Sequence, residues 1–143
     1  MTLTDKVCLV TGGARGIGRA IALAYAAAGA KAVYAIDVAF DDAAAWPAAV
    51  TPVVLDLTDG AAVAAAVARI HAAEGRIDVL VNNAGITRDA LIQKMSDDDW
   101  DAVIAVNLTA VFKLTRAVGP LMIAQGAGAI VNMASIVALT GNV

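Results

Sequence analysis

The fold of this chain is decided by residues 11–18, Thr11-Gly12-Gly13-Ala14-Arg15-Gly16-Ile17-Gly18. This glycine-rich loop follows an apolar run, 7–10, that predicts a buried strand, and it opens a helical pattern that continues to Ala28. Gly12 permits a sharp turn, Gly16 removes a side chain where a pyrophosphate approaches, and Gly18 allows close packing of helix on strand. The start of such a helix offers free N–H groups and partial positive charge to phosphates. The loop therefore predicts a dinucleotide-binding site, with ordinary turn glycines as the alternative.

Short β-branched runs alternate with helical patterns along the rest of the chain. The expected strands are residues 7–10, 32–36, 53–55, 79–81 and 129–133. Four helices are expected. The first covers residues 16–28, and the second is a short, poor helix over 41–50 that Pro47 interrupts. Thr58 caps the third, which ends near Gly75, and Ser96 caps the fourth, a long helix from Asp97 to about Ile123. The alternation predicts an α/β fold, with one nucleotide-binding domain over residues 1–143 and a doubly wound parallel sheet of strand order 3-2-1-4-5.

Composition restricts the classes of function. A net charge of −3 without a basic stripe argues against a nucleic-acid-binding protein. Cys8 is the only cysteine, so no internal disulfide can form, and residues 1–6 show no signal-peptide pattern; both favour the cytoplasm. No charge occurs from Ala117 to Val143, but Gly119-Pro120 interrupts this stretch, which we interpret as a helix end, a turn and a buried strand. Membrane association is the alternative that the hydrophobicity leaves open.

The spacing of the loop, Gly-x-x-x-Gly-x-Gly after a threonine, resembles that of the short-chain dehydrogenase/reductase family. Further motifs follow in the family order: Asp56-Leu57 ends the third expected strand, Asn82-Asn83-Ala84-Gly85 ends the fourth, Asn107 lies in the long helix, and Ser135 ends the fifth strand. The resemblance extends over nearly the whole chain. It implies a Rossmann fold and an NAD(P)-dependent oxidoreductase that moves a hydride between a nicotinamide cofactor and a carbonyl or alcohol.

The resemblance also implies roles for individual residues. It implies that Asn82 ties neighbouring strands, that Ser135 hydrogen-bonds the substrate carbonyl, and that Asn107 interrupts its helix and holds a proton-relay water. Considered alone, each residue has a structural alternative of equal weight. Asp56 would cap a helix, Asn107 would be a surface asparagine and Ser135 would cap a strand end. The residues expected to bind the cofactor are Gly12, Ala14, Arg15, Gly16, Ile17, Gly18, Asp37, Asp56, Leu57, Asn83, Ala84 and Gly85.

Asp37 bears on the choice of cofactor. It follows the second expected strand, about twenty residues beyond the glycine loop, where a carboxylate accepts hydrogen bonds from the ribose hydroxyls of NAD. A 2′-phosphate at that place would be repelled by Asp37. Arg15 favours NADP, since a basic residue there often accompanies NADP in the family. We expect Asp37 to outweigh Arg15 because it contacts the hydroxyl directly, so NAD is preferred and NADP remains possible. A solvated loop aspartate is the alternative.

Two stretches narrow the match within the family. Residues 85–91, Gly-Ile-Thr-Arg-Asp-Ala-Leu, and residues 140–143, Thr-Gly-Asn-Val, resemble the 3-oxoacyl-[acyl-carrier-protein] reductases of fatty acid metabolism. This implies reduction of a 3-oxoacyl thioester of acyl-carrier protein or coenzyme A, or of a similar ketone. Those reductases usually carry basic residues before the fifth strand, and residues 125–129 contain none, which leaves a coenzyme A thioester or another alcohol open. The resemblance also implies a homotetramer formed through the long helix.

The family's Tyr-x-x-x-Lys pair, in which the lysine lowers the pKa of a proton-donating tyrosine, follows the serine. The sequence continues for eight residues after Ser135, and Tyr25 and Tyr34 are followed by Gly29 and Val38 where the lysine belongs. We therefore expect a domain that is incomplete at its C-terminus, lacks the last strands and is inactive because it is truncated. The alternative is a non-catalytic nucleotide-binding fragment or partner subunit.

No metal site is expected. His71 is the only histidine and falls at a predicted surface position near the end of a helix. Asp97, Asp98 and Asp99 are placed at the positive end of the long helix, where carboxylates need no metal. Trp46 and Trp100 are predicted to be packing residues.

Overall fold

The structure, a computed structural model, describes residues 2–41, 45–136 and 140–141. Within these residues, five strands form one parallel sheet in the order β3-β2-β1-β4-β5, which confirms the predicted α/β fold and strand order. The strands are β1 (Val7–Thr11), β2 (Ala32–Asp37), β3 (Val50–Val54), β4 (Val79–Asn82) and β5 (Ala129–Asn132). The helices are α1 (Gly16–Ala27), α2 (Gly60–Glu74), α3 (Asp97–Ile104) and α4 (Ala110–Gln125), and the π-helical turn η1 (Ala105–Thr109) joins α3 to α4.

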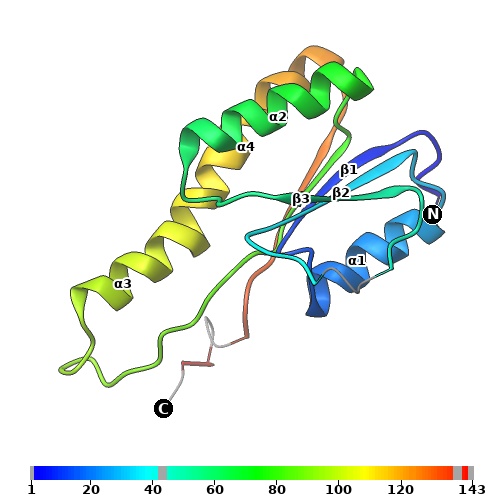
Figure 1. The fold of residues 1–143 in the computed structure, drawn as a ribbon. Coiled ribbons are helices and arrows are strands. Elements are labelled where there is room, and N and C mark those ends of the chain that lie inside the picture. Colours follow the sequence, from blue (N-terminus) through cyan, green and yellow to red (C-terminus); the bar gives the residue numbers. More distant parts are fainter. Residues whose placement is uncertain (1, 42–44, 137–139, 142–143) are drawn as a thin grey trace.

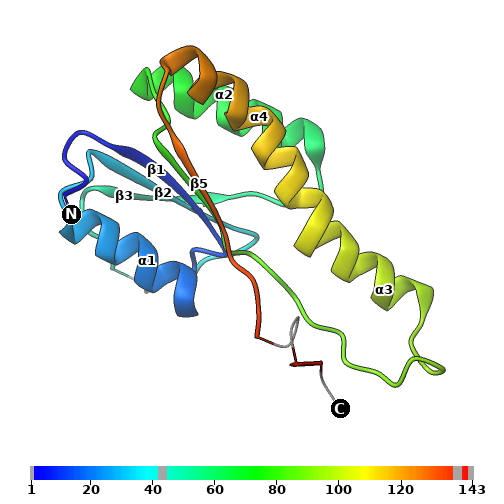
Figure 2. The same cartoon turned by 180° about the vertical axis from the view of Figure 1, so that it is seen from behind.

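Helices cover both faces of the sheet. Helix α1 lies on one face, and α2 and α4 lie side by side on the other (Figure 1), as the view from behind also shows (Figure 2). All five residues of β1 are buried, because this central strand is covered on both faces and paired on both edges. The strand order reverses between β1 and β4. In sheets of this kind, ligands bind in the crevice at the carboxyl ends of the strands at such a reversal.

Two apolar clusters join the three layers. The cluster on the α2 and α4 face contains Leu9, Leu80 and Leu114, each at most 1% exposed. The cluster on the α1 face is built largely from smaller residues such as Ala22 and Ala35. Burial of one leucine side chain contributes about 1.5–3 kcal/mol, so each of these three leucines stabilises the fold by roughly that amount.

A buried carboxylate joins the amino ends of β1 and β4. Asp78 is 5% exposed and accepts hydrogen bonds from the Val7 N–H at 3.0 Å, Arg76 Nε at 2.7 Å, Lys6 Nζ at 3.3 Å and Gln125 Nε2 at 3.3 Å. Burial alone would raise the pKa of Asp78. The hydrogen bonds from Arg76, Val7 and Lys6 outweigh that effect and lower the pKa to about 2.

The segment before β3 differs from the expectation. The prediction of a helix over 41–50 is wrong for the described residues. Residues 45–47 have no regular structure, 48–49 form a turn and Val50 begins β3. Residues 42–44 lie outside the described residues. The Pro47 carbonyl accepts the Val50 N–H at 2.8 Å, which closes this turn. β3 also begins earlier than predicted and contains Pro52, which is tolerated because β3 is an edge strand that needs fewer backbone donors.

The helix caps agree in part with the expectation. Asp59, rather than Thr58, caps α2, because its Oδ1 accepts the N–H groups of Ala61 and Ala62 at 2.9 and 3.0 Å. Ser96 caps α3 as predicted, through an N–H donated to its Oγ from the first turn. The long helix ends at Gln125, close to the predicted end near Ile123, and η1 interrupts it.

The combined helix Asp97–Gln125 is the one stretch, among the residues described, that is long and apolar enough to cross a membrane by length and composition. Of its most apolar window, 17% is buried. One such helix is weak evidence, since a helix of a soluble protein passes the same test.

Candidate functional site

The glycine loop joins β1 to α1 in a conformation that favours glycine. The φ angles of Gly12 and Gly16 are 65° and 55°, and a Cβ on Gly16 would meet no atom within 4 Å. A Cβ on Gly18 would collide with the carbonyl oxygen of Gly12, so only glycine allows the loop to fold against α1. Arg15, the N-cap residue of α1, makes no capping hydrogen bond through its side chain. The first N–H groups of α1 therefore remain available to an anionic ligand.

Thr11 fixes the glycine loop to the end of β4. Its buried Oγ1 accepts the N–H groups of Asn83 at 2.9 Å and Ala84 at 3.0 Å and donates to the carbonyl of Val81 at 3.3 Å. Asn83 Nδ2 donates in return to the carbonyl of Thr11 at 2.8 Å. The two segments that the sequence assigns to the cofactor are thus held as one unit at the carboxyl ends of β1 and β4.

Asp37 is held beside the same loop. It is the last residue of β2, and its Oδ2 accepts the N–H of Ala14 at 3.0 Å, while its Oδ1 accepts the N–H of Val38 at 2.8 Å. Both bonds are donated by backbone N–H groups, so they hold the carboxylate in one orientation. A carboxylate has acceptor sites beyond these two, and those remain for hydroxyl donors of a ligand.

These segments enclose a cavity of about 260 Å³ at the carboxyl ends of the strands. The structure brings eight of the residues expected to bind a cofactor to its wall: Gly12, Arg15, Asp37, Asp56, Leu57, Asn83, Ala84 and Gly85. Ala14 lines a neighbouring cavity instead, Gly18 is buried under the loop, and Ile17 is exposed. Eight of the twelve predicted residues therefore converge on one place although they lie far apart in the sequence, whereas Ala14, Gly16, Ile17 and Gly18 do not line this cavity.

Asp56 shapes one side of this cavity. Its Oδ1 accepts both the N–H of Thr58 at 2.8 Å and the hydroxyl of Thr58 at 2.7 Å. These bonds lower the pKa of Asp56, with the hydroxyl bond as the largest cause. They close a turn of the kind that aspartate often makes before a helix. Lys113 of α4 donates to the carbonyl of Thr58 and so attaches this turn to the helix.

Asn107 lies in η1, where the long helix departs from regular α-helical bonding. Its Oδ1 accepts the N–H of Ile86 at 2.9 Å, and its Nδ2 donates to the carbonyl of Ile86 at 2.9 Å. The side chain therefore pairs with a backbone segment as a strand would, and it holds the chain that leaves β4 against the helix. π-helical turns occur frequently at functional sites.

Ser135 lies three residues beyond the end of β5 at Asn132 and is exposed. The expectation that Ser135 itself ends the strand is therefore wrong, and Ser135 is absent from the residues that line the cavity around Asp37. The segments after β4 and β5 both leave the carboxyl-end edge of the sheet (Figure 2). Asn82 Nδ2 donates to Asn132 Oδ1 at 2.8 Å and joins the ends of these two strands.

Comparison with known protein families decides how this arrangement is classified. Residues 6–143 match the family of the short chain dehydrogenases. The chain belongs to the short chain dehydrogenase family. The glycine loop, the Asn-Asn-Ala-Gly segment 82–85 and the parallel Rossmann-like sheet all lie within the matched residues.

Several known proteins resemble this chain over most of its length. It is 47% identical to the 3-oxoacyl-[acyl-carrier-protein] reductase FabG of Thermotoga maritima, over 99% of this chain and 60% of the relative. It is also 47% identical to an acetoacetyl-CoA reductase of Shinella zoogloeoides, over 92% of this chain and 56% of the relative. The structure of a short-chain dehydrogenase from Streptomyces avermitilis matches 92% of this chain and 50% of its own, with 38% identity and a TM-score of 0.85. The chain thus spans about 60% of the length of the first of these relatives.

Some residues that line the cavity with Asp37 were not indicated by the sequence. They are Val38, Leu55, Thr58, Ile86 and Val106. Each directly adjoins a residue that was expected to be functional, and of the five only Thr58 is polar. Adjacency to a motif is therefore the signal that could have found them. In the described part of the chain, no three His, Cys, Asp or Glu side chains are grouped so that they could hold a metal ion.

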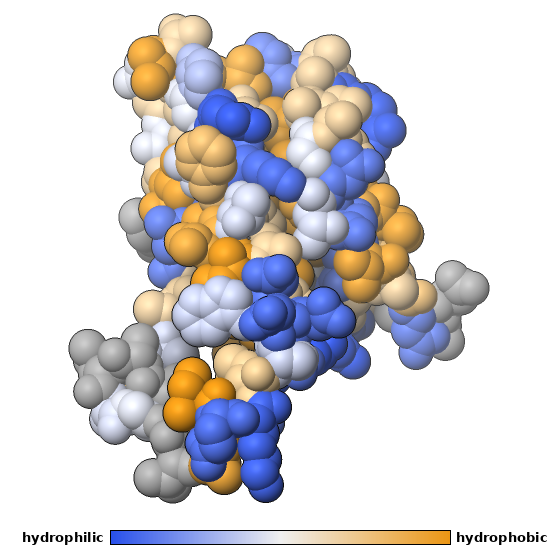
Figure 3. Space-filling view, turned by 90° about the vertical axis from the view of Figure 1, so that its left-hand side faces the viewer, coloured by the Kyte–Doolittle hydropathy of each residue, from blue (hydrophilic) through white to orange (hydrophobic). Residues whose placement is uncertain are grey.

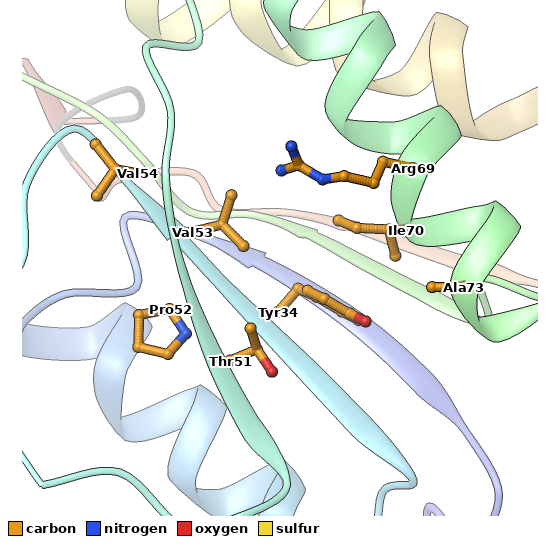
Figure 4. A pocket seen from close by; sticks show the side chains of 8 residues that line it. All are labelled: Tyr34, Thr51, Pro52, Val53, Val54, Arg69, Ile70 and Ala73. Atoms are coloured by element: carbon orange, nitrogen blue, oxygen red, sulfur yellow. The ribbon is translucent and has the colours of Figure 1, made fainter.

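The two tyrosines lie away from this cavity. Tyr34 lines a separate groove of about 420 Å³ between β3 and α2, where Arg69 approaches from the helix (Figure 4). Burial and a 2.8 Å hydrogen bond donated to Glu74 Oε1 raise the pKa of Tyr34 to about 12. Tyr25 of α1 packs beside the apolar cluster on the other face of the sheet. Neither tyrosine of this short chain dehydrogenase lines the cavity with Asp37.

Proposed function

We propose that this chain binds a nicotinamide dinucleotide, NAD in preference to NADP, for an oxidoreductase that acts on a 3-oxoacyl thioester or a similar ketone. One observation carries the proposal: Arg15, the N-cap residue at the start of α1, and the backbone-held carboxylate of Asp37 line the same crevice. Free N–H groups suit the pyrophosphate, and a carboxylate suits the ribose hydroxyls. The open space around Gly16 fits close approach of such a ligand.

The cofactor-binding residues divide by the part of the dinucleotide that each would hold. Ala14, Gly16 and Ile17, at or before the first turn of α1, would meet the pyrophosphate. Asp56 and Leu57 would hold the adenine edge, and the segment 83–85 would line the ribose. Gly12 and Gly18 allow the loop conformation that this contact needs.

Preference for NAD follows from charge. A phosphate on the 2′ position would approach Asp37 as a like charge, at a cost of about 4 kcal/mol per pair of unit charges at an effective dielectric of about 20. Screening in an open crevice reduces this to roughly 1–3 kcal/mol, which is about ten- to a hundredfold in affinity. Arg15 lines the same cavity and offsets part of that cost. Titration calorimetry with NAD and NADP tests this preference, and tighter binding of NADP would contradict it.

The substrate proposal rests on relatives that reduce thioesters of acyl-carrier protein and coenzyme A. The bound dinucleotide would supply or accept a hydride. Ser135 would orient the carbonyl by a hydrogen bond, and Asn107, which holds η1 to Ile86, would support proton relay. Oxidation of NADH followed at its absorbance band, with acetoacetyl-CoA as the substrate, tests this activity. Where turnover is observed, Ser135→Ala is expected to abolish it and to leave NADH binding unchanged.

A second function is favoured by the placement of the tyrosines. Tyr34 lines the groove between β3 and α2 and donates to Glu74, and Tyr25 packs against the cluster on the α1 face, so neither tyrosine lines the cavity with Asp37. A nucleotide-binding module without turnover fits this observation. NADH binding together with no acetoacetyl-CoA-dependent oxidation would support the module, and turnover would exclude it.

We also propose a homotetramer in the cytoplasm, formed through α3 and α4 without membrane attachment. Trp100, Leu108 and Phe112 are each more than half exposed on this helix. The side of the molecule that carries α3 shows apolar residues among hydrophilic ones (Figure 3). Size-exclusion chromatography with light scattering tests the assembly, and Phe112→Asp should shift it toward smaller species.

A further inference from the structure

A second cavity adjoins the proposed ribose site on the far side of Asp37. Its volume is about 630 Å³, and its wall includes Arg15, Arg19, Asp37 and Phe40. Arg15 and Asp37 also line the first cavity, so the two cavities adjoin at the carboxylate. A phosphate on the 2′ position of a bound ribose would project toward this region, where an arginine is the usual partner.

Arg19 lines this cavity, yet its charge is engaged elsewhere. The guanidinium carbon lies 4.9 Å from the centroid of the Trp46 ring, and Nη2 donates to the carbonyl of Ala45 at 3.4 Å. Among the residues that the structure describes, no ion pair joins Asp37 to Arg15 or Arg19. The cation–π contact therefore holds Arg19 toward the segment before β3 and away from the carboxylate.

Trp46 is itself fixed in place. Its ring meets Phe40 edge to face, with centroids 5.9 Å apart and an interplanar angle of 73°. Both rings pack against the apolar cluster on the α1 face of the sheet. The indole therefore offers Arg19 a rigid surface, and the aromatic pair connects the chain after β2 with the chain before β3.

We infer that Trp46 is a specificity-determining residue, which positions Arg19 away from the 2′ position and thereby keeps the preference for NAD. This inference rests on the proposed function. Asp37 repels a 2′-phosphate, and Arg15, which lines both cavities, offsets only part of that repulsion, so the discrimination weakens if a second cation reaches the phosphate. Arg19, released from the ring, would remain on the wall of the same cavity and could donate charge-assisted hydrogen bonds to the phosphate.

The competing explanation is that Trp46 only fills space, as the sequence predicts. Loss of packing would loosen the segment before β3 and would weaken or leave unchanged both cofactors alike. Only the positioning role predicts that loss of the ring at position 46 raises the affinity for NADP relative to NAD. It also predicts that this change requires Arg19 and does not occur when another aromatic ring replaces Trp46. These three signatures separate the two explanations.

The experiment measures the dissociation constants of NAD and NADP by titration calorimetry, on the unmodified chain and on Trp46→Leu, Trp46→Phe, Arg19→Ala and the double variant Trp46→Leu/Arg19→Ala. Leucine keeps apolar packing without a ring, and phenylalanine keeps a ring. We expect Trp46→Leu to raise the affinity for NADP relative to NAD roughly tenfold, the effect of one hydrogen bond to a charged group. We expect Trp46→Phe and the double variant to keep the original ratio.

Each outcome decides one question. The inference is overturned if Trp46→Leu leaves the ratio of the NAD and NADP dissociation constants unchanged. It is also overturned if Trp46→Leu changes this ratio equally with and without Arg19. In either case, NAD binding by the unmodified chain still upholds the proposed function. A fall in NADP affinity in Arg19→Ala alone also overturns it, because Arg19 would then already serve the phosphate. Failure of the unmodified chain to bind either cofactor overturns both. Circular dichroism of each variant confirms that it is folded, and Trp46→Met replaces Trp46→Leu if the latter does not fold.

Discussion

The Oδ2 of Asp37 accepts the backbone N–H of Ala14 at 3.0 Å. This bond connects the last residue of β2 with the glycine loop, and it places a carboxylate next to the start of α1. A negative charge and a set of anion-binding N–H groups therefore stand side by side, which suits a ligand that has hydroxyl donors and a phosphate close together.

Replacement of Asp37 tests this relationship. Asp37→Ala removes the acceptor for the ribose hydroxyls and the charge that repels a 2′-phosphate. We expect NAD affinity to fall roughly tenfold and NADP affinity to rise or stay constant. Titration calorimetry measures both. The matched control is Asp101→Ala, which removes a carboxylate from the exposed surface of α3 and should change neither affinity. Equal weakening of both cofactors in Asp37→Ala would speak against a ribose contact.

Two glycines of the loop should respond differently to alanine. At Gly18 a Cβ collides with the carbonyl oxygen of Gly12, so the backbone must shift. At Gly16 the Cβ enters open space, and the cost is backbone strain of about 1–2 kcal/mol at a φ of 55°. We expect Gly18→Ala to lower the melting temperature more than Gly16→Ala. Gly16→Ala should chiefly reduce cofactor affinity, and unchanged NAD binding in that variant would contradict close approach at Gly16.

Thr11 should be sensitive to loss of its hydroxyl. Thr11→Val keeps the volume but leaves the N–H groups of Asn83 and Ala84 without their acceptor. We expect a loss of about 2–3 kcal/mol in the free energy of unfolding, because these groups are partly buried. Urea denaturation measures the loss. Thr11→Ser restores the oxygen and should recover most of the stability, whereas equal losses in both variants would show that the methyl group matters instead.

Asp78 should make stability depend on pH at the acid end. Its pKa is about 2 in the folded chain and 3.8 when unperturbed, so the folded state favours the charged form. The resulting stabilisation, about 2 kcal/mol, is complete above pH 4 and is lost as the pH falls from 4 to 2. Urea denaturation across this range measures it. Asp78→Asn should be less stable at pH 7, and its free energy of unfolding should fall less steeply between pH 4 and 2 than that of the unmodified chain. An identical pH dependence in both proteins would assign the effect to other carboxylates.

The sequence predicted the sheet order and most strands because periodicity and turn residues are local signals. The segment before β3 was misassigned, since Pro47 weakens a helix without revealing that Val50 pairs with Val33 of β2. The caps show the same limit: Asp59 and Thr58 are both good cap residues, and only backbone geometry selects between them.

The sequence by itself determined the identity and order of the chemical groups: the glycines that permit a left-handed loop, the carboxylate after β2 and the amides after β4. Spacing along the chain carries that information, because each motif belongs to one turn or one strand end. Only the tertiary structure decided which of these groups meet. Ala14 approaches Asp37, Asn107 pairs with Ile86, and Arg19 stacks on Trp46 because parallel pairing brings strand ends together and packing fixes the direction of each side chain. Contacts between residues far apart in the sequence depend on that packing, which no local pattern records.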